Sequence, residues 1–98
     1  MHIQIFITQM IKKRLVVAQP FIGKFIREIR QEIGLTQEQF AAEVGVTCSS
    51  VNRWENGRGK PLPLAMEKIL ILLEQMGESP DATLRKRSQE LLEQYISK

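Results

Sequence analysis

The sequence predicts an all-α domain of five helices, and three observations support this prediction. From Pro20 onward, apolar residues recur at three- and four-residue steps, the period of a helix with one buried face. Glycine or proline stands near each break in that pattern, and serine or threonine precedes several of the restarts. The 98 residues are 43% hydrophobic, which is enough apolar material for one small core.

The first helix is predicted between Pro20 and Gly34, because glycine is the usual residue just past a helix C-terminus. Its apolar residues form one stripe, and its charged and amide residues fall on the other side. The stripe consists of Ile22, Phe25, Ile26, Ile29 and Ile33. We expect this stripe to face the core.

Two short helices follow, and a glycine separates them. The first opens at Thr36, whose hydroxyl caps the helix start while Gln39 reaches back, as in a capping box. Its inward residues are Phe40, Ala41 and Val44. Gly45 breaks the pattern, and Thr47 caps the next helix, which ends near Glu55.

The fourth helix starts near Pro63, a residue that a first helical turn tolerates, and closes at Gly77. Its predicted buried stripe is Leu62, Met66, Ile69, Leu70, Leu73 and Met76. Ser79 and Pro80 are predicted as the cap and first position of a fifth helix. The apolar residues of that helix are Leu91, Leu92, Tyr95 and Ile96.

Residues 1–19 fall outside the helical pattern. Ile3, Ile5 and Ile7 alternate with polar residues, which hints at a strand, but Phe6 interrupts the alternation. A strand, a fraying arm and a partly disordered segment therefore stay open as alternatives for this N-terminal extension.

The charge distribution favours a polyanionic partner. The net charge is +3; residues 1–60 carry nine Lys or Arg against five acids, whereas residues 61–98 carry five against six. One cysteine and one histidine exclude a disulfide framework and a zinc site built from one chain, so we expect no metal and no cofactor.

The N-terminal apolar stretch precedes its positive charges, which is the reverse of a signal peptide. The longest unbroken apolar run in the second half, Ile69–Leu73, is too short to span a bilayer. We therefore expect a cytoplasmic protein without a membrane contact.

Two helices joined by a tight, glycine-containing turn form a helix-turn-helix. Counting from Gln37, Ala41 lies four residues on and Gly45 eight. The alanine lets the next helix cross closely, and the glycine can take the positive φ of a sharp turn.

Projection of that next helix places Val51, Trp54 and Glu55 inward, and Ser49, Asn52, Arg53 and Asn56 outward. Asn52 and Arg53 lie at the centre of the outward face, and their side chains suit adenine and guanine edges.

The inward position of Glu55 predicts an ion pair, because a lone buried carboxylate is costly. The same projection puts Arg30 at the edge of the apolar stripe on the first helix. We infer a partly buried Arg30–Glu55 ion pair that ties the first helix to the third.

These features together resemble the lambda-repressor-like, or XRE/Cro, family over about residues 21–77. The matching residues are Arg30, Gly34-Leu35-Thr36-Gln37, Phe40-Ala41, Gly45-Val46-Thr47 and Val51-Asn52-Arg53-Trp54-Glu55-Asn56-Gly57. The resemblance implies a five-helix, all-α fold that binds palindromic double-stranded DNA operators as a dimer and represses transcription. Residues 20–78 would be the helix-turn-helix domain, between the extension at 1–19 and a C-terminal helix at 79–98.

The resemblance also implies which residues contact the DNA backbone. Gln37, at the start of the second helix, would contact a phosphate and help to orient the third. Thr47 would cap the third helix or bind a phosphate. Arg58 and Lys60 fall where the family grips the backbone. The Arg30–Glu55 pair matches a pair that the family also uses.

Cys48, Ser49 and Arg53 occupy the positions that usually read bases in this family, with Ser50 and Asn52 beside them. Family members often carry longer side chains, such as Gln or Arg, at the positions of Cys48 and Ser49. Direct readout in this chain would therefore rest heavily on Arg53 and Asn52.

A dimer needs a contact surface, and surplus apolar residues lie in two places: Leu91, Leu92, Tyr95 and Ile96 in the last helix, and Ile3 to Val17 at the start. We predict the contact in the last helix, joined by the N-terminal segment as a strand. The alternative is that the last helix folds back onto the first and fourth helices.

Three classes of function compete. The leading one is a DNA-binding transcriptional regulator. The second is an antitoxin that represses its own operon, with residues 1–19 and 80–98 as candidates to bind the toxin. The third is a helical interaction module without DNA binding, against which Gln37, Arg53 and the basic loop argue. An enzyme is not expected, because one histidine and one cysteine cannot supply a nucleophile, a base and an orienting group.

Overall fold

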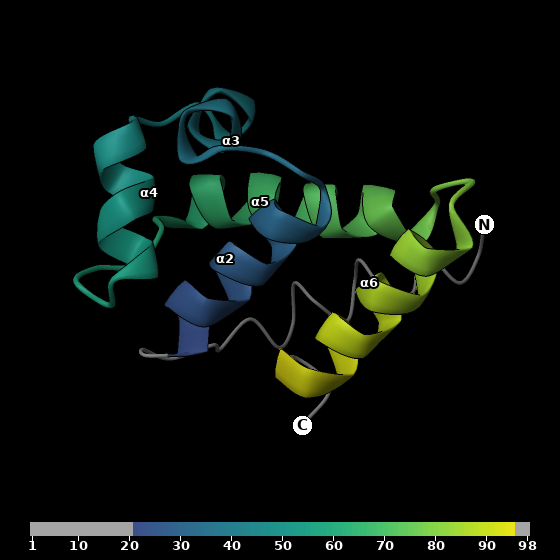
Figure 1. The fold of residues 1–98 in the computed structure, drawn as a ribbon. Helices are drawn as coiled ribbons and strands as arrows, with labels where there is room; N and C mark the ends of the chain where they lie inside the picture. The colour runs from purple at the N-terminus through teal and green to yellow at the C-terminus, as the bar shows by residue number, and fades with distance from the viewer. Residues whose placement is uncertain (1–20, 96–98) are drawn as a thin grey trace.

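Five helices make up the described part of the chain, residues 21–95 of a computed structural model (Figure 1). They are α2 (Phe21–Glu32), α3 (Gln37–Val44), α4 (Cys48–Glu55), α5 (Pro63–Gly77) and α6 (Ala82–Tyr95). No strand occurs between residues 21 and 95, and the predicted all-α class is confirmed. The predicted N-terminal extension, with its candidate strand, and Ile96 lie outside the described residues.

The ends of the two central helices follow the predicted local signals. Thr36 caps α3 through a complete capping box with Gln39. Gly45 ends α3 with a φ of 82°, a left-handed conformation that glycine adopts without a steric penalty. Thr47 caps α4, and its hydroxyl oxygen accepts a hydrogen bond from the backbone N–H of Ser50. The turn between the two helices is therefore fixed by residues that the sequence pattern identifies.

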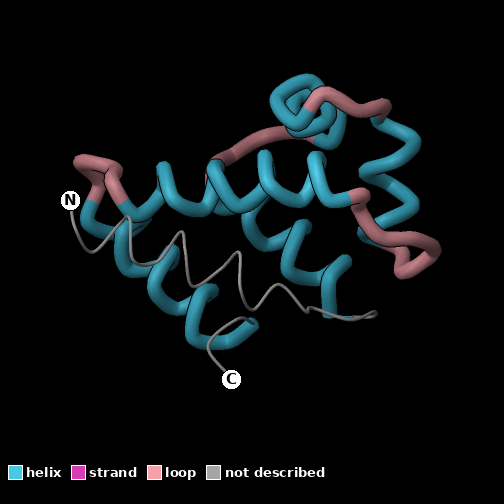
Figure 2. The backbone as a smooth tube through the Cα atoms, turned by 180° about the vertical axis from the view of Figure 1, so that it is seen from behind, coloured by secondary structure: helices cyan, strands magenta, loops and turns pink. Residues whose placement is uncertain are grey.

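The core draws on every helix, and α4 lies at its edge. α2 packs against α4, α5 and α6, whereas α4 packs chiefly against α2 and α3. In Figure 1, α4 and α6 lie on opposite sides of the molecule. Figure 2 shows the loops before and after α5 at the two ends of that helix. The orientation of α4 therefore depends on its contacts with α2 and α3.

The fourth helix has its predicted bounds, but one prediction of burial and one of a helix start are wrong. Leu62 was expected in the buried stripe of the fourth helix, but it is 77% exposed, because it is the N-cap residue and lies outside the helical repeat. The fifth helix was expected to open at Ser79 and Pro80, but it begins at Ala82. The carboxylate of Asp81 caps it by accepting a hydrogen bond from the N–H of Thr83 at 2.8 Å.

The C-terminal helix folds back onto α2 and α5, which is the alternative to a dimer contact. Leu91 and Leu92 are buried in the core of the chain itself. The hydroxyl of Tyr95 donates to the carboxylate of Glu28 in α2, and Arg87 forms an ion pair with Glu32 at 3.0 Å. The two leucines that were expected at a dimer contact are therefore occupied within one chain.

Gly23 sets how closely α2 and α4 approach. It is buried in the first turn of α2, and a Cβ atom added there would stand 2.3 Å from the backbone carbonyl oxygen of Trp54. A backbone atom cannot rotate away as a side chain can, so only glycine allows this crossing. Gly23 was not singled out from the sequence, although a glycine inside an apolar helical stripe costs helix propensity and in general points to a close contact.

We predict that Gly23→Ala destabilises the fold by about 1–3 kcal/mol, although alanine is the better helix former, because the methyl group overlaps the Trp54 carbonyl. Urea denaturation measures the free energy of unfolding. Gly59→Ala is the matched control, since its new Cβ would meet only the flexible end of Arg53 at 3.2 Å. Equal or greater stability of Gly23→Ala would show that the two helices do not cross at this distance.

Candidate nucleic-acid interface

α4 presents a polar face to solvent and an apolar face to the core. Its exposed polar residues are Ser49, Asn52 and Arg53, and Asn56 follows at the C-cap. On the opposite side Val51 and Trp54 are in the core, and Glu55 is buried beside them. The predicted projection is therefore observed, and α4 has the amphipathic form of a helix that can lie in a DNA groove.

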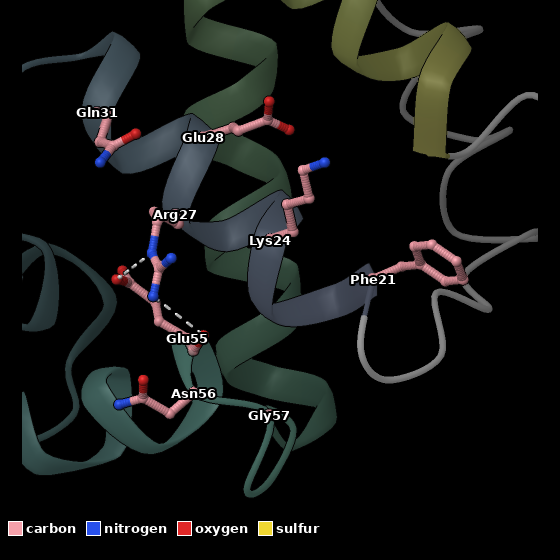
Figure 3. A pocket seen from close by; sticks show the side chains of 8 residues that line it. All are labelled: Phe21, Lys24, Arg27, Glu28, Gln31, Glu55, Asn56 and Gly57. Carbon is pink, nitrogen blue, oxygen red and sulfur yellow. Dashed lines mark hydrogen bonds and ion pairs between the residues drawn. The ribbon is translucent and has the colours of Figure 1, made fainter.

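The carboxylate of Glu55 joins three helices, and its side chain is only 1% exposed. The predicted partner, Arg30 of α2, makes a two-point contact: Nε lies 2.6 Å from Oε2, and Nη2 lies 3.0 Å from Oε1. Arg27 of the same helix donates to Oε1 at 3.3 Å and to the Glu55 carbonyl at 3.2 Å (Figure 3). Gln37 of α3 donates from Nε2 to Oε1 at 3.1 Å. This carboxylate therefore links α4 to both of the helices against which it packs.

Burial alone would raise the pKa of Glu55, but the hydrogen bonds from Arg30 and Gln37 outweigh it and hold that pKa below its usual range. The hydrogen bond to Glu55 in turn raises the pKa of Arg30. Arg30 also donates from Nη1 to the carbonyl of Leu35 at 3.0 Å, in the segment between α2 and α3. The Arg30–Glu55 ion pair stays charged at neutral pH, and the hydrogen bond from Arg30 to Leu35 also holds the segment that leads into α3.

Two asparagines extend the network along the exposed side of α4. Asn52 donates from Nδ2 to the side-chain oxygen of Gln37 at 3.3 Å. Asn56 donates from Nδ2 to the side-chain oxygen of Asn52 at 3.1 Å and to its backbone carbonyl at 2.9 Å. The structure thus brings two residues from the predicted site, Gln37 and Asn52, into direct contact.

The start of α4 carries only short side chains. The hydroxyl groups of Thr47 and Ser50 lie 3.0 Å apart, and both belong to the helix cap. Cys48 is half-buried and packs against the core, whereas Ser49 is exposed. With no long side chain in the first turn, the backbone of α4 can approach a partner closely.

The basic residues that follow the polar face are exposed. The loop after α4 is tied to the helix by a hydrogen bond from the N–H of Arg58 to the carbonyl of Arg53 at 2.9 Å. The guanidinium of Arg53 lies beside Gly59 in this loop. Arg53, Arg58 and Lys60 therefore form one basic area at the C-terminal end of α4.

Sequence reasoning missed the contribution of Arg27. It was placed on the polar face of the first helix, yet it precedes Arg30 by three residues, and side chains at that spacing are neighbours on a helix. A shallow hollow beside it is lined by Phe21, Lys24, Arg27, Glu28, Gln31, Glu55, Asn56 and Gly57 (Figure 3).

Within residues 21–95, no group of three or more His, Cys, Asp and Glu could hold a metal ion. No helix in that range is long and apolar enough to cross a membrane.

We predict that Glu55→Ala lowers the free energy of unfolding by about 3 kcal/mol, because it leaves Arg30 partly buried without its carboxylate. Urea denaturation at pH 7 measures the difference. Glu93→Ala in α6 is the matched control, since Glu93 is exposed. Equal stability of the two variants would show that the Glu55 carboxylate contributes nothing to the fold.

The same pair of proteins gives a pH test. Since the pKa of Glu55 is lowered in the folded state, its contribution is complete above the unfolded value of about 4.3 and is lost as the pH falls below it. The stability difference between wild type and Glu55→Ala should therefore shrink as the pH falls below about 4.3. A difference independent of pH would mean that the charge of Glu55 is not involved.

Comparisons with known proteins agree with this geometry. The helix-turn-helix family model matches residues 26–77, slightly more than half of the chain, from within α2 to the end of α5. The chain is also similar to an uncharacterized HTH-type transcriptional regulator of Methanothermobacter thermautotrophicus, with 46% identity over 44 residues. That match spans 45% of this chain and 64% of the relative. No solved structure matches the chain significantly.

The matched region contains the capped helix pair, the left-handed glycine between the two helices and the buried Glu55 with both of its arginine partners. It also contains the whole polar face of α4 and the basic loop that follows. The chain therefore belongs to the lambda-repressor-like, or XRE/Cro, helix-turn-helix family.

Proposed function

We propose that this protein binds double-stranded DNA sequence-specifically and regulates transcription. The observation that carries the proposal is the exposed polar face of α4, held in a fixed orientation by the buried Glu55 and flanked by the basic loop. The similarity to an HTH-type transcriptional regulator supports the regulatory part of the proposal.

α4 is the helix that enters the major groove. Its short side chains at Cys48, Ser49 and Ser50 let the first turn approach the base edges closely. Arg53 is the longest donor on the exposed face, and a guanidinium suits the two acceptors of guanine. Arg53 is therefore the principal base-reading side chain in this account.

Four residues around α4 contact the phosphates. Gln37 and Thr47 stand at the starts of α3 and α4, where backbone N–H groups also favour an anion. Arg58 and Lys60 supply positive charge in the loop after α4. Contacts of this kind fix the register on the duplex and carry no sequence information themselves.

We further propose that the protein acts as a dimer and as a repressor. One recognition helix reads only a few base pairs, which is too little to single out one site in a genome. Two copies would read half-sites about 34 Å apart. Because Leu91 and Leu92 are buried within one chain, the contact between copies must use other surfaces.

The antitoxin alternative is not favoured by a specific observation. One of its candidate toxin-binding segments, residues 1–19, lies outside the described residues. In the other, residues 80–98, the two leucines of α6 pack into the core of the same chain. A transcriptional regulator therefore remains the leading proposal.

The direct test is selection of bound duplexes from a random-sequence library, followed by fluorescence-anisotropy titration with one selected duplex and one random duplex. Wild type should prefer the selected duplex by at least a thousandfold. Binding that shows no sequence preference, or no binding at all, would contradict the proposal.

We predict that Arg53→Ala costs about 1–3 kcal/mol on the selected duplex and less on the random duplex, because a base contact carries sequence information. The same anisotropy titrations measure both losses. Lys86→Ala is the matched control, since Lys86 is an exposed cation on α6, on the other side of the molecule (Figure 1). Equal losses on the two duplexes would show that Arg53 contacts phosphate only.

We predict that Arg58→Ala together with Lys60→Ala weakens binding to both duplexes alike. Binding releases about one counterion for each phosphate contact, so the variant that lacks two contacts releases about two fewer. The slope of log K against log salt concentration should therefore flatten by about two units. A salt titration measures this slope. An unchanged slope would remove the loop from the DNA interface.

A further inference from the structure

The network around Glu55 fixes the orientation of three amide side chains. An ionised carboxylate only accepts hydrogen bonds, so Gln37 must turn its nitrogen toward Glu55. The oxygen of the Gln37 amide then faces Asn52, which must donate its own nitrogen. The oxygen of Asn52 in turn faces Asn56, which donates. The buried charge of Glu55 therefore determines, for each of the three amides, which neighbour the nitrogen faces and which neighbour the oxygen faces.

This orientation matters for a phosphate contact. A phosphate accepts hydrogen bonds, so an amide can bind it only through a nitrogen. The amide nitrogen of Gln37 carries two hydrogens, and the contact with Glu55 leaves one of them to donate. In the flipped orientation the oxygen of Gln37 would take the place of this nitrogen and repel the phosphate.

Both polar atoms of the Asn52 side chain, the nitrogen and the oxygen, form hydrogen bonds in the free protein. Its nitrogen donates to Gln37 at 3.3 Å, and its oxygen accepts from Asn56 at 3.1 Å. Bidentate recognition of adenine uses one nitrogen and one oxygen of an asparagine. The nitrogen keeps a second hydrogen and the oxygen a second lone pair, but the two contacts fix the plane of the amide. Bidentate reading of adenine would therefore compete with these contacts, and Gln37 would lose the partner of its oxygen if Asn52 turned away.

We propose that Asn52 is a positioning residue: it holds the amide of Gln37 in the orientation that Glu55 sets, with Asn56 behind it, so that Gln37 presents an N–H group to the DNA backbone. This role rests on the proposed function and assigns Asn52 to backbone binding in place of base readout. It leaves Arg53 as the base-reading side chain among the longer residues of the exposed face.

One arm of the test needs no DNA. Nuclear magnetic resonance of the free protein follows the side-chain N–H signals of Gln37 in wild type, Asn52→Ala and Gln89→Ala. Gln89 is an exposed amide on α6 and serves as the matched control. The Gln37 signals should shift in Asn52→Ala and stay in place in Gln89→Ala. Unchanged Gln37 signals in Asn52→Ala would overturn the contact itself.

The second arm is a double-mutant cycle on DNA, with the selected and the random duplexes described above. Asn52→Ala should weaken binding to both duplexes by a similar factor, roughly three- to tenfold, because one charge-assisted contact is impaired. In a Gln37→Ala background, Asn52→Ala should have less than about a twofold further effect. The slope of the salt titration should stay unchanged, since no cation is removed.

The contrary outcomes are distinct. A full effect of Asn52→Ala in the Gln37→Ala background, confined to the selected duplex, would make Asn52 a base reader and overturn the proposal. Melting temperatures show whether each variant is folded, and the exposed position of Asn52 predicts little change. If wild type selects no duplex, the proposed function fails, while the resonance arm still decides whether Asn52 orients Gln37.

Discussion

The buried carboxylate of Glu55 is the constraint on which the rest of this structure depends. A charge with 1% of its side chain exposed must be paired, and the pairing draws two arginines from α2 and one glutamine from α3 onto the end of α4. Apolar packing alone would hold α4 in place but would leave it freer to turn about its axis. The hydrogen bonds to Glu55 have direction, and they fix which face of α4 meets solvent.

The interior and exterior of α4 are therefore parts of one arrangement. Gly23 lets the backbones of α2 and α4 come close enough for Arg27 and Arg30 to reach Glu55. The same carboxylate orients Gln37, which lies at the edge of the exposed face. At the far side, α6 braces α2 through Tyr95 and its contact with Glu28. The polar face of α4 thus rests on a rigid support, as a site for precise recognition requires.

The fold was largely predictable because its signals are local. Caps, left-handed glycines and the apolar period each act within a few residues, and the Glu55 pair follows from one helical projection. The errors have the same origin: Leu62 fits the period but lies one residue before α5, and Asp81 is a better cap than Ser79. Contacts between distant segments, such as Gly23 with Trp54, leave no periodic trace and required the structure.

The central claim is that the surface which Glu55 holds in place is the surface that meets DNA. Titration of the isotope-labelled protein with a selected duplex, followed by the shifts of backbone amide signals, tests it most directly. We expect the largest shifts at the start of α3, along α4 and in the loop at 58–60, with small shifts in α6. Large shifts confined to α5 and α6, with α4 unaffected, would contradict it.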